Sequence, residues 1–346
     1  MTHLIPKLGN AEAKNTMITP PTAAPVLDIR DLHVQFTTRD GAVPAVVGLS
    51  LRVAAGEIVG LVGESGCGKS TTALATMRLL PPYASISGQI RVDDQDLVPL
   101  SEGEMRRIRG ERVAMIFQDA LAALDPTMTV GRQIMEPLTI HLGMSGDAAR
   151  HRAIGLLDLV GIPSPASRMR QHPHEFSGGM RQRVMIATAL ACNPHLLLAD
   201  EPTTALDVTV QRQILNLLLG LRAEMGAGIV LITHDVGVVG EICDRVVVMY
   251  AGREVESGPT EAVFTRPRHP YTQGLLGSTL DATQDRDTPL HAIPGLPPDL
   301  AHLPAGCVFA PRCPLATEIC RQQEPPLVQV APGQQSACWH WQEVAA

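Results

Sequence analysis

The segment GESGCGKST, residues 63 to 71, constrains the fold of this chain more than any other stretch. It fits the pattern G-x-x-x-x-G-K-[ST] through Gly63, Gly68, Lys69 and Ser70. The apolar run EIVGLV precedes it and the helix-forming run KSTTALATMRLL follows it, which is the setting that the pattern requires. A glycine-rich turn with a chance Lys-Ser pair would lack these flanks. The sequence therefore predicts a phosphate-binding loop between a buried strand and a helix.

The residue types of this loop suit a nucleoside triphosphate and its cation. The glycines let backbone N–H groups turn toward phosphate oxygens, and the N-terminus of the helix adds its positive end. We expect Lys69 to reach the β- and γ-phosphates and the Ser70 hydroxyl to ligate Mg²⁺. The residues expected to contact the nucleotide are Gly63, Glu64, Ser65, Gly66, Cys67, Gly68, Lys69, Ser70 and Thr71.

An acidic pair ends a second apolar run, HLLLADEP. Asp200 closes the run and is expected to hold the Mg²⁺ shell, while Glu201 follows it and is placed to polarise an attacking water. Many strands end in acidic turns, so the pattern gains its meaning from the phosphate-binding loop upstream. Together the two segments predict a nucleotide-hydrolysing site.

Short apolar runs alternate with helical patterns from Val26 onward, as expected of an α/β fold. Between Leu206 and Met225 apolar residues recur at helical spacing, which predicts an amphipathic helix. Residues 119 to 193 lack strand signals and are rich in helix formers, so they predict a helical insertion. The expected strands are Ile58–Val62, Val113–Phe117, Leu196–Asp200, Ile229–Thr233 and Arg245–Tyr250, with a hairpin after the last.

The two ends of the chain differ from its middle. Residues 1–25 lack the continuous apolar stretch of a signal peptide and are expected to form a flexible tail. After residue 258 prolines cluster and periodicity fades, which predicts a small, loop-rich C-terminal domain over 259–346 beside a main domain over 26–258. No apolar run approaches the ~18 residues that cross a bilayer. The net charge of -7 gives no general attraction to nucleic acid, so none is expected as a partner.

A third segment, FSGGMRQR at residues 176 to 183, has no explanation in an ordinary enzyme with a phosphate-binding loop. It resembles the signature segment of the ABC-transporter ATPases. Gln118 ends the run RVAMIFQ as the family's Q-loop glutamine does, and Ala205-Leu206-Asp207 resembles the D-loop. His234 is similar to the switch histidine, and Phe36 to the aromatic residue that stacks on adenine. These elements occur in the family's order.

The resemblance implies a P-loop NTPase (RecA-like) nucleotide-binding domain over residues 26–258, with a helical subdomain at about 119–193. In this family ATP lies between the phosphate-binding loop of one subunit and the signature of another, so a dimer is expected. The signature residues Ser177, Gly178 and Gly179 would bind the partner's γ-phosphate at a helix N-terminus. The resemblance further assigns Glu201, His234 and Gln118 to hydrolysis, Gln118 also to the Mg²⁺ shell, and Asp207 to the nucleotide site.

A narrower resemblance extends further along the chain. The segments ITHDVGVVGEICDRVVVMYAGR, RPRHPYTQGLL and PAGCVFAPRCPLATEIC are similar to the D-type ATPase of dipeptide and oligopeptide importers. Phe176 and Met180 depart from the general signature, and the D-type shares both departures. This resemblance implies ATP-driven peptide import with two membrane permeases, an F-type paralogous ATPase as heterodimer partner, and an extracytoplasmic solute-binding protein. The chain would then lie at the cytoplasmic face of the inner membrane as a peripheral subunit.

Other functions stay open beside peptide import. Related importers carry nickel chelates, glutathione or oligosaccharides, and the solute is selected by other subunits. Soluble ABC-type proteins that act in DNA repair or on ribosomes usually carry a long coiled-coil insertion or two ATPase domains, and this sequence shows neither. A regulatory ATPase with a redox-sensing cysteine tail is a further alternative.

Four of the seven cysteines lie in the proline-rich tail with the spacing C-x5-C-x6-C-x17-C: Cys307, Cys313, Cys320 and Cys338. In the reducing cytosol, metal ligation is more common than a disulfide for such a set. Four thiolates suit a [4Fe–4S] cluster or zinc. Zinc ligands usually come in close pairs, which are missing here, and clusters occur in similar tails of peptide-importer ATPases, so we expect [4Fe–4S], with zinc or no metal as alternatives. Cys67, Cys192 and Cys243 are expected to be small core or loop residues.

Overall fold

The computed structural model describes residues 24–39, 41–203, 207–278 and 293–344. Within these ranges eight strands form the main sheet, in the order β11-β12-β10-β9-β3-β8-β7-β6. Its central strands are β3 (Ile58–Val62), β6 (Val113–Ile116), β7 (Leu196–Asp200), β8 (Gly228–Thr233) and β9 (Arg245–Tyr250). These five strands pair in parallel. The predicted strands and the α/β class are confirmed.

The parallel strands are short apolar runs because helices and a second sheet cover both of their faces. Every residue of β3, β7 and β8 is buried, as expected for a parallel sheet that is covered on both faces. The strand β10 (Arg253–Pro259) follows β9 through the predicted hairpin and pairs with it antiparallel.

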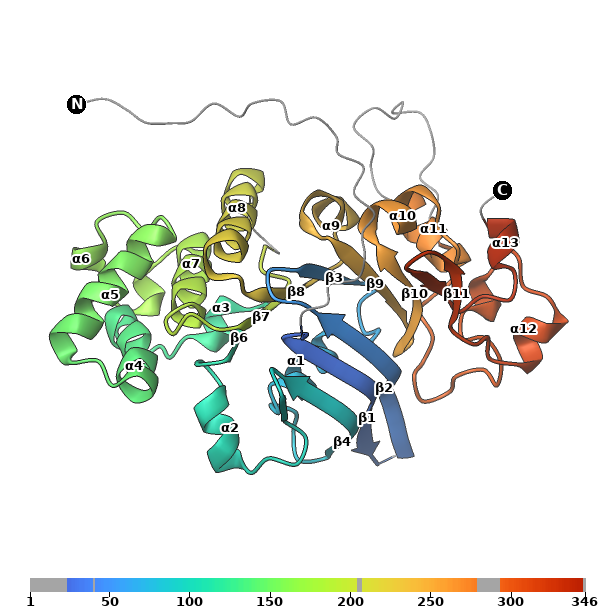
Figure 1. The fold of residues 1–346 in the computed structure, drawn as a ribbon, viewed down its shortest axis with the longest axis horizontal. Helices are drawn as coiled ribbons and strands as arrows, with labels where there is room; N and C mark the ends of the chain where they lie inside the picture. The colour runs from blue at the N-terminus through green and yellow to red at the C-terminus, as the bar shows by residue number, and fades with distance from the viewer. Residues whose placement is uncertain (1–23, 40, 204–206, 279–292, 345–346) are drawn as a thin grey trace.

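The second sheet is antiparallel and was not predicted from the sequence. Its order is β2-β1-β4-β5, formed by β1 (Leu27–Thr38), β2 (Gly41–Val53), β4 (Ala84–Val92) and β5 (Gln95–Asp96). It packs on the main sheet through a shared apolar cluster, which also includes residues of α1 (Lys69–Thr76). Figure 1 shows the sheet in blue and teal beside α1. This sheet carries Phe36.

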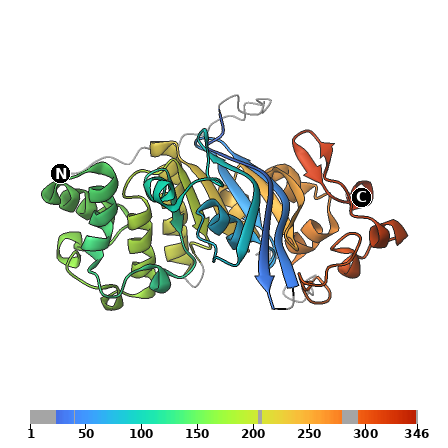
Figure 2. The same cartoon turned by 90° about the horizontal axis from the view of Figure 1, so that it is seen from below.

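The region between β6 and β7 is helical, as the sequence predicts. Its helices are α3 (Ala120–Ala123), α4 (Val130–Leu142), α5 (Gly146–Leu159), α6 (Pro165–Arg168), a 3-10 turn at Pro173–Glu175, and α7 (Gly178–Ala189). A further helix, α2 (Glu102–Ile108), precedes β6. Figures 1 and 2 show α4, α5 and α7 gathered at one end of the molecule, away from the C-terminal region.

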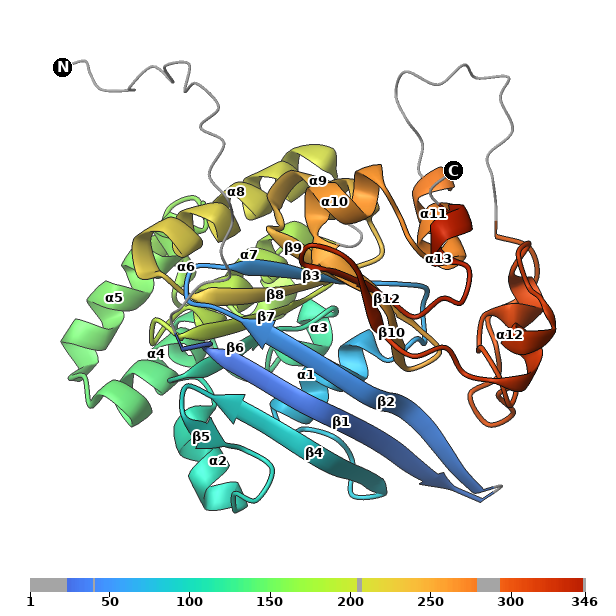
Figure 3. The same cartoon turned by 45° about the vertical axis from the view of Figure 1, so that its right-hand side comes forward.

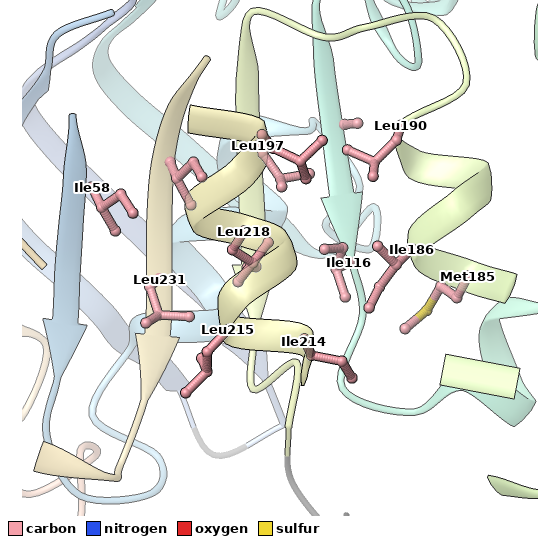
Figure 4. Close-up of a cluster of buried hydrophobic side chains, with 14 of the residues drawn as sticks. Ile58, Ile116, Met185, Ile186, Leu190, Leu197, Ile214, Leu215, Leu218 and Leu231 are labelled. Carbon is pink, nitrogen blue, oxygen red and sulfur yellow. The ribbon is translucent and has the colours of Figure 1, made fainter. Parts of the chain in front are cut away.

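Helix α8 (Val208–Met225) confirms the amphipathic helix expected at this point, although Leu206 lies outside the described residues. Its apolar face packs over the main sheet. Leu215 and Leu218 lie against residues of β7 and β8 such as Leu197 and Leu231 in one buried cluster (Figure 4). Helix α9 (Val236–Ile242) follows β8 and packs on the same sheet.

The C-terminal region continues the main sheet. It contains α10 (Thr260–Thr265), α11 (Pro270–Gly277), a 3-10 turn at Ala310–Arg312, α12 (Glu318–Gln322), β11 (Val328–Ala331), β12 (Gln334–Ser336) and α13 (Trp341–Val344). Strand β12 pairs antiparallel with β10, with Ser336 opposite Glu256, and the two lie side by side in Figure 3.

The expected boundary at residue 258 therefore falls inside β10. Tyr271, Val308 and Phe309 are buried in the same core cluster as the central strands. The described part of 259–346 therefore packs on the main core. Its sequence has few periodic apolar residues from which to build a separate core. The expected flexible tail, residues 1–25, lies outside the described residues except for its last two positions. No helix in the described ranges is long and apolar enough to cross a membrane.

Candidate functional site

The phosphate-binding loop joins β3 to α1, as the sequence predicts. Gly63 adopts φ 151, and a Cβ there would lie 2.2 Å from the Met249 carbonyl oxygen, so no larger residue fits. Gly68 caps α1 in a left-handed conformation with φ 103. The Lys69 ammonium is buried and donates to the carbonyl oxygens of Gly63 and Glu64, each at 2.8 Å. The ammonium thus lies inside the curve of the loop, where a phosphate would compete for it.

Two of the expected magnesium ligands touch. The Ser70 hydroxyl donates to a carboxylate oxygen of Asp200 at 3.0 Å. Burial raises the pKa of the Asp200 carboxyl above its ordinary value, and the negative charge of Glu201 adds to this effect. The hydrogen bond from Ser70 and the positive charge of Lys69 lower the pKa but do not cancel the rise. A divalent cation would oppose the effect of burial. Hydroxyl and carboxylate oxygens are the ligand types that Mg²⁺ takes, so the pair fits this ion.

The three residues expected to assist hydrolysis lie together at the ends of the central strands. The Gln118 amide donates to one Glu201 carboxylate oxygen at 2.8 Å. The His234 ring nitrogen Nδ1 lies 3.1 Å from the other oxygen. Glu201 itself has φ 46, a left-handed conformation that is uncommon outside glycine. Gln118 contacts Glu201 here, and no hydrogen bond between it and Ser70 or Asp200 is present among the described contacts.

The signature segment begins α7 at the surface. Ser177 and Gly178 are exposed, Gly179 is half-buried, and the Ser177 hydroxyl accepts from the Met180 N–H as the helix cap. Asp207 caps α8 by accepting from the Val210 N–H. The other two D-loop residues, Ala205 and Leu206, lie outside the described residues. An exposed helix N-terminus of this kind suits an anion presented by another molecule.

Phe36 is half-buried on β1 and gains an aromatic neighbour that the sequence did not reveal. Tyr83 lies with its ring centre 6.1 Å from that of Phe36 and is 60% exposed. The two rings form an aromatic surface at one end of the β1–β4 pair, where Phe36 lies opposite Ala84. Tyr83 comes directly after Pro81-Pro82, and no pattern in the sequence ties it to Phe36.

The loop residue Glu64 is contacted by two residues of the C-terminal region that the sequence did not single out. The Glu64 N–H donates to the Tyr271 hydroxyl oxygen at 2.7 Å. The Arg312 guanidinium donates to both Glu64 carboxylate oxygens, at 2.7 and 2.9 Å. Tyr271 lies in the segment RPRHPYTQGLL and Arg312 in PAGCVFAPRCPLATEIC, two segments that carry the narrower resemblance, but nothing in the sequence connects either residue with Glu64.

The four tail cysteines line one small cavity together with His269, Phe309 and Trp339. None forms a disulfide. Within the described ranges, however, no group of three or more His, Cys, Asp or Glu side chains is arranged to hold a metal ion. Burial raises the pKa of the Cys338 thiol to about 12 and that of Cys313 to about 11. The expected [4Fe–4S] cluster is therefore not supported by the side-chain arrangement. Cys67, Cys192 and Cys243 are buried, as expected.

Comparison with protein families gives two matches along the chain. Residues 46–204 match the ABC transporter family, and residues 255–320 match the C-terminal region of oligopeptide/dipeptide transporters. Among solved structures, the ATP-binding cassette MJ0796, a dimer in a post-hydrolysis state bound to ADP and Pi, superposes with a TM-score of 0.62 at 29% identity. The match covers 68% of this chain and 98% of that one.

Whole-chain relatives are closer. The chain is 49% identical to a probable peptide ABC transporter ATP-binding protein of Sinorhizobium fredii, over 94% of this chain and 97% of that protein. It is 51% identical to the oligopeptide transport ATP-binding protein OppD of Bacillus subtilis, over 88% and 86% of the two chains. The strand order, the loop and the two family matches agree with these likenesses. The chain belongs to the family of peptide ABC transporter ATP-binding proteins and carries the ABC ATPase fold.

Proposed function

We propose that this chain is the ATP-hydrolysing subunit that powers import of dipeptides or oligopeptides through a membrane transporter. The observation that carries the proposal is the meeting of Gln118 and His234 on the Glu201 carboxylate, next to the Ser70–Asp200 pair. That arrangement suits the hydrolysis of a phosphate anhydride, because it places a general base next to a magnesium site. The names of the relatives supply the solute class.

The roles of the residues follow from their chemistry. Lys69 and the loop N–H groups would bind the phosphates, and Ser70 and Asp200 would hold Mg²⁺, which neutralises charge on the phosphates. Glu201 would orient and deprotonate the attacking water, with His234 and Gln118 holding its two oxygens. Phe36 would stack on adenine, with Tyr83 extending the same surface.

Dimer formation would complete the site. Ser177 and Gly178 are exposed at the start of α7. Among the described contacts, neither residue is hydrogen-bonded to the phosphate-binding loop of this chain. We propose that they bind ATP held by the loop of a paralogous F-type subunit, and that the F-type signature does the same for this chain. Two permeases and an extracytoplasmic solute-binding protein would complete the importer, with the ATPases peripheral on the cytoplasmic face.

For the tail cysteines we propose a [4Fe–4S] cluster, with zinc as the alternative. The support is the number of thiols and their shared cavity, formed by Cys307, Cys313, Cys320 and Cys338. The thiols would have to approach one another on binding. The role of the cluster would be to stabilise residues 259–346. We propose that this segment is a separate C-terminal domain that packs against the main domain.

Metal analysis decides the cofactor. Protein purified without oxygen should contain about four iron and four sulfide per chain by the composition of the cluster, and a quadruple Cys→Ser variant should contain neither. One zinc per chain would show that the cysteines bind zinc and not an iron–sulfur cluster. The absence of both iron and zinc would show that the four cysteines are metal-free thiols.

The function is tested with the transporter reconstituted in vesicles from this chain, its F-type partner, the permeases and the solute-binding protein. Peptides should stimulate ATP hydrolysis and accumulate inside, and the isolated chain should be a poor ATPase because it lacks the partner's signature. Stimulation by a nickel chelate, glutathione or an oligosaccharide in place of peptides would reassign the solute. Full activity in a verified monomer would contradict the dimeric mechanism.

A further inference from the structure

Glu64 is the second residue of the phosphate-binding loop, and it is held at three points. Its N–H donates to the Tyr271 hydroxyl, its carbonyl oxygen accepts from Lys69, and its carboxylate accepts from Arg312. Two of the three contacts come from the C-terminal region. The pairing of Glu64 with Arg312 joins residues 248 positions apart.

The Glu64–Arg312 pair is well enclosed. The Arg312 side chain is 7% exposed and that of Glu64 is 23% exposed. The same guanidinium donates through Nε to the Pro294 carbonyl oxygen at 2.8 Å. This additional hydrogen bond restrains the orientation of the guanidinium plane. A bidentate arginine–carboxylate pair of this kind is among the stronger and geometrically more specific contacts in proteins. Arg312 is therefore placed to hold Glu64 in one position.

The elements that carry Arg312 and Tyr271 pack on a common aromatic cluster. Tyr250, Tyr271 and Phe309 pack as a ring cluster with centroid separations of 4.6 to 5.4 Å. Arg312 lies on the 3-10 turn Ala310–Arg312, directly after Phe309 and before Cys313. One short turn thus connects the aromatic core, the cysteine cavity and the phosphate-binding loop.

The charge of Glu64 needs compensation if the loop is to bind a polyanion. A carboxylate beside bound phosphates would repel them, and the effect is large where solvent is partly excluded. Within the described contacts of Glu64, Arg312 is the cation that meets its carboxylate. The guanidinium stays charged, since the hydrogen bonds to Glu64 raise the pKa of Arg312.

We propose that Arg312 is a positioning residue for the nucleotide site: it neutralises Glu64 and fixes the phosphate-binding loop in the shape that accepts the triphosphate. The C-terminal region is then part of the ATP-binding apparatus of its own chain. This inference rests on the nucleotide site proposed above and adds a residue that lies outside every segment matching the general ABC motifs.

The experiment measures the dissociation constants of Mg²⁺-ATP and Mg²⁺-ADP for the purified full-length chain and five variants. Arg312→Ala should weaken ATP binding about tenfold, the size of one charge interaction of about 1.4 kcal/mol, and ADP binding by less, because ADP carries less charge. Arg312→Ala combined with Glu64→Gln should recover most of the ATP affinity. Glu64→Gln alone keeps an oxygen that can accept from Arg312 but removes the negative charge beside the phosphates, so it should bind ATP more tightly than the unchanged chain.

The fourth variant, Arg321→Ala, is the control, since Arg321 forms an exposed ion pair with Glu318 in the same region. It should leave both constants unchanged. A purely structural role for Arg312 predicts equal losses for ATP and ADP and no recovery in the double variant, and that result would overturn the proposal, as would an unchanged ATP affinity in Arg312→Ala. If Arg312→Ala fails to fold, the double variant and Glu64→Gln decide. ATP binding by Glu64→Gln that is no tighter than that of the unchanged chain overturns the proposal, as does a tenfold weaker ATP affinity in the double variant.

The proposed function is checked in the same experiment by Lys69→Ala. If Lys69→Ala binds ATP about 10- to 150-fold more weakly than the unchanged chain, the nucleotide site stands, and the Arg312 variants judge the inference alone. If the unchanged chain and Lys69→Ala show the same affinity, the nucleotide site itself is wrong.

Discussion

The Gln118 amide donates a 2.8 Å hydrogen bond to the Glu201 carboxylate, although the two residues are 83 positions apart. Gln118 directly precedes the helical region that begins at α3, and Glu201 directly follows β7. A movement of the helical region would therefore shift a contact of the residue proposed to activate water. This contact gives a physical route by which the position of the helices, and of any membrane subunit bound to them, can alter hydrolysis.

Replacing Lys69 by alanine should weaken ATP binding by about 10- to 150-fold, because hydrogen bonds to charged groups contribute about 1.5–3 kcal/mol. The Lys69 ammonium is buried and donates to two carbonyl oxygens of the loop. A phosphate bound in the loop would therefore be the main anion that it contacts. Equilibrium binding of Mg²⁺-ATP measures the effect. Unfolding midpoints of both proteins serve as the control, and unaltered ATP affinity would remove Lys69 from the phosphate site.

Replacing Leu218 by alanine should destabilise the chain by about 2–5 kcal/mol, the usual range for emptying a packed site. Leu218 is fully buried between α8 and the main sheet (Figure 4). Leu159→Ala is the matched control, because Leu159 is 50% exposed; its effect should stay within about 0.5 kcal/mol. Urea unfolding measures both, and equal losses would show that α8 is not packed as described.

Acid should destabilise the chain partly through His269. This side chain is 1% exposed, and burial lowers its pKa to about 3. Between pH 6.5 and 3 the unfolded chain binds a proton at this residue and the native chain does not, so lowering the pH favours unfolding by about 1.4 kcal/mol per pH unit. The contribution is absent above pH 6.5.

The measurement is the urea midpoint of the unchanged chain and of His269→Gln at pH 7, 6 and 5. The variant should be less stable at pH 7 but should lose less stability on acidification. His302→Gln, at an exposed position, should follow the unchanged chain. Parallel curves for His269→Gln and the unchanged chain would show that His269 does not stay neutral in the native state.

The sequence predicted best what is local and buried. Strands β3, β7 and β9 begin and end where expected, because a parallel strand covered on both faces is a continuous apolar run between polar residues. The phosphate-binding loop followed from its motif and flanks. The family resemblance assigned Gln118, Glu201 and His234 to one reaction, and the structure brings the three side chains into contact. The antiparallel sheet was missed because β1 and β2 are long and interrupted by bulges, which blurs their alternation.

Contacts between distant segments could not be predicted. Strand β12 is the polar run Gln334–Ser336, and it depends on antiparallel pairing with β11 on one side and β10 on the other. The Glu64–Arg312 pair likewise depends on how the C-terminal region folds back over the loop. Nothing in a single sequence identifies two such charges as partners. The cysteine spacing indicated that the four thiols belong together, and they do line one cavity, but spacing alone did not determine whether a metal occupies it.

Steady-state ATP hydrolysis by the assembled transporter carrying Glu201→Gln tests the central claim most directly. ATP binding should be retained and peptide uptake lost, while hydrolysis falls about 10²–10⁴-fold, the range for removal of a general base. Glu224→Gln is the matched control, since Glu224 is exposed on α8, and it should hydrolyse ATP at the unchanged rate. Near-normal hydrolysis and uptake with Glu201→Gln would contradict the assignment of Glu201 and the mechanism built on it.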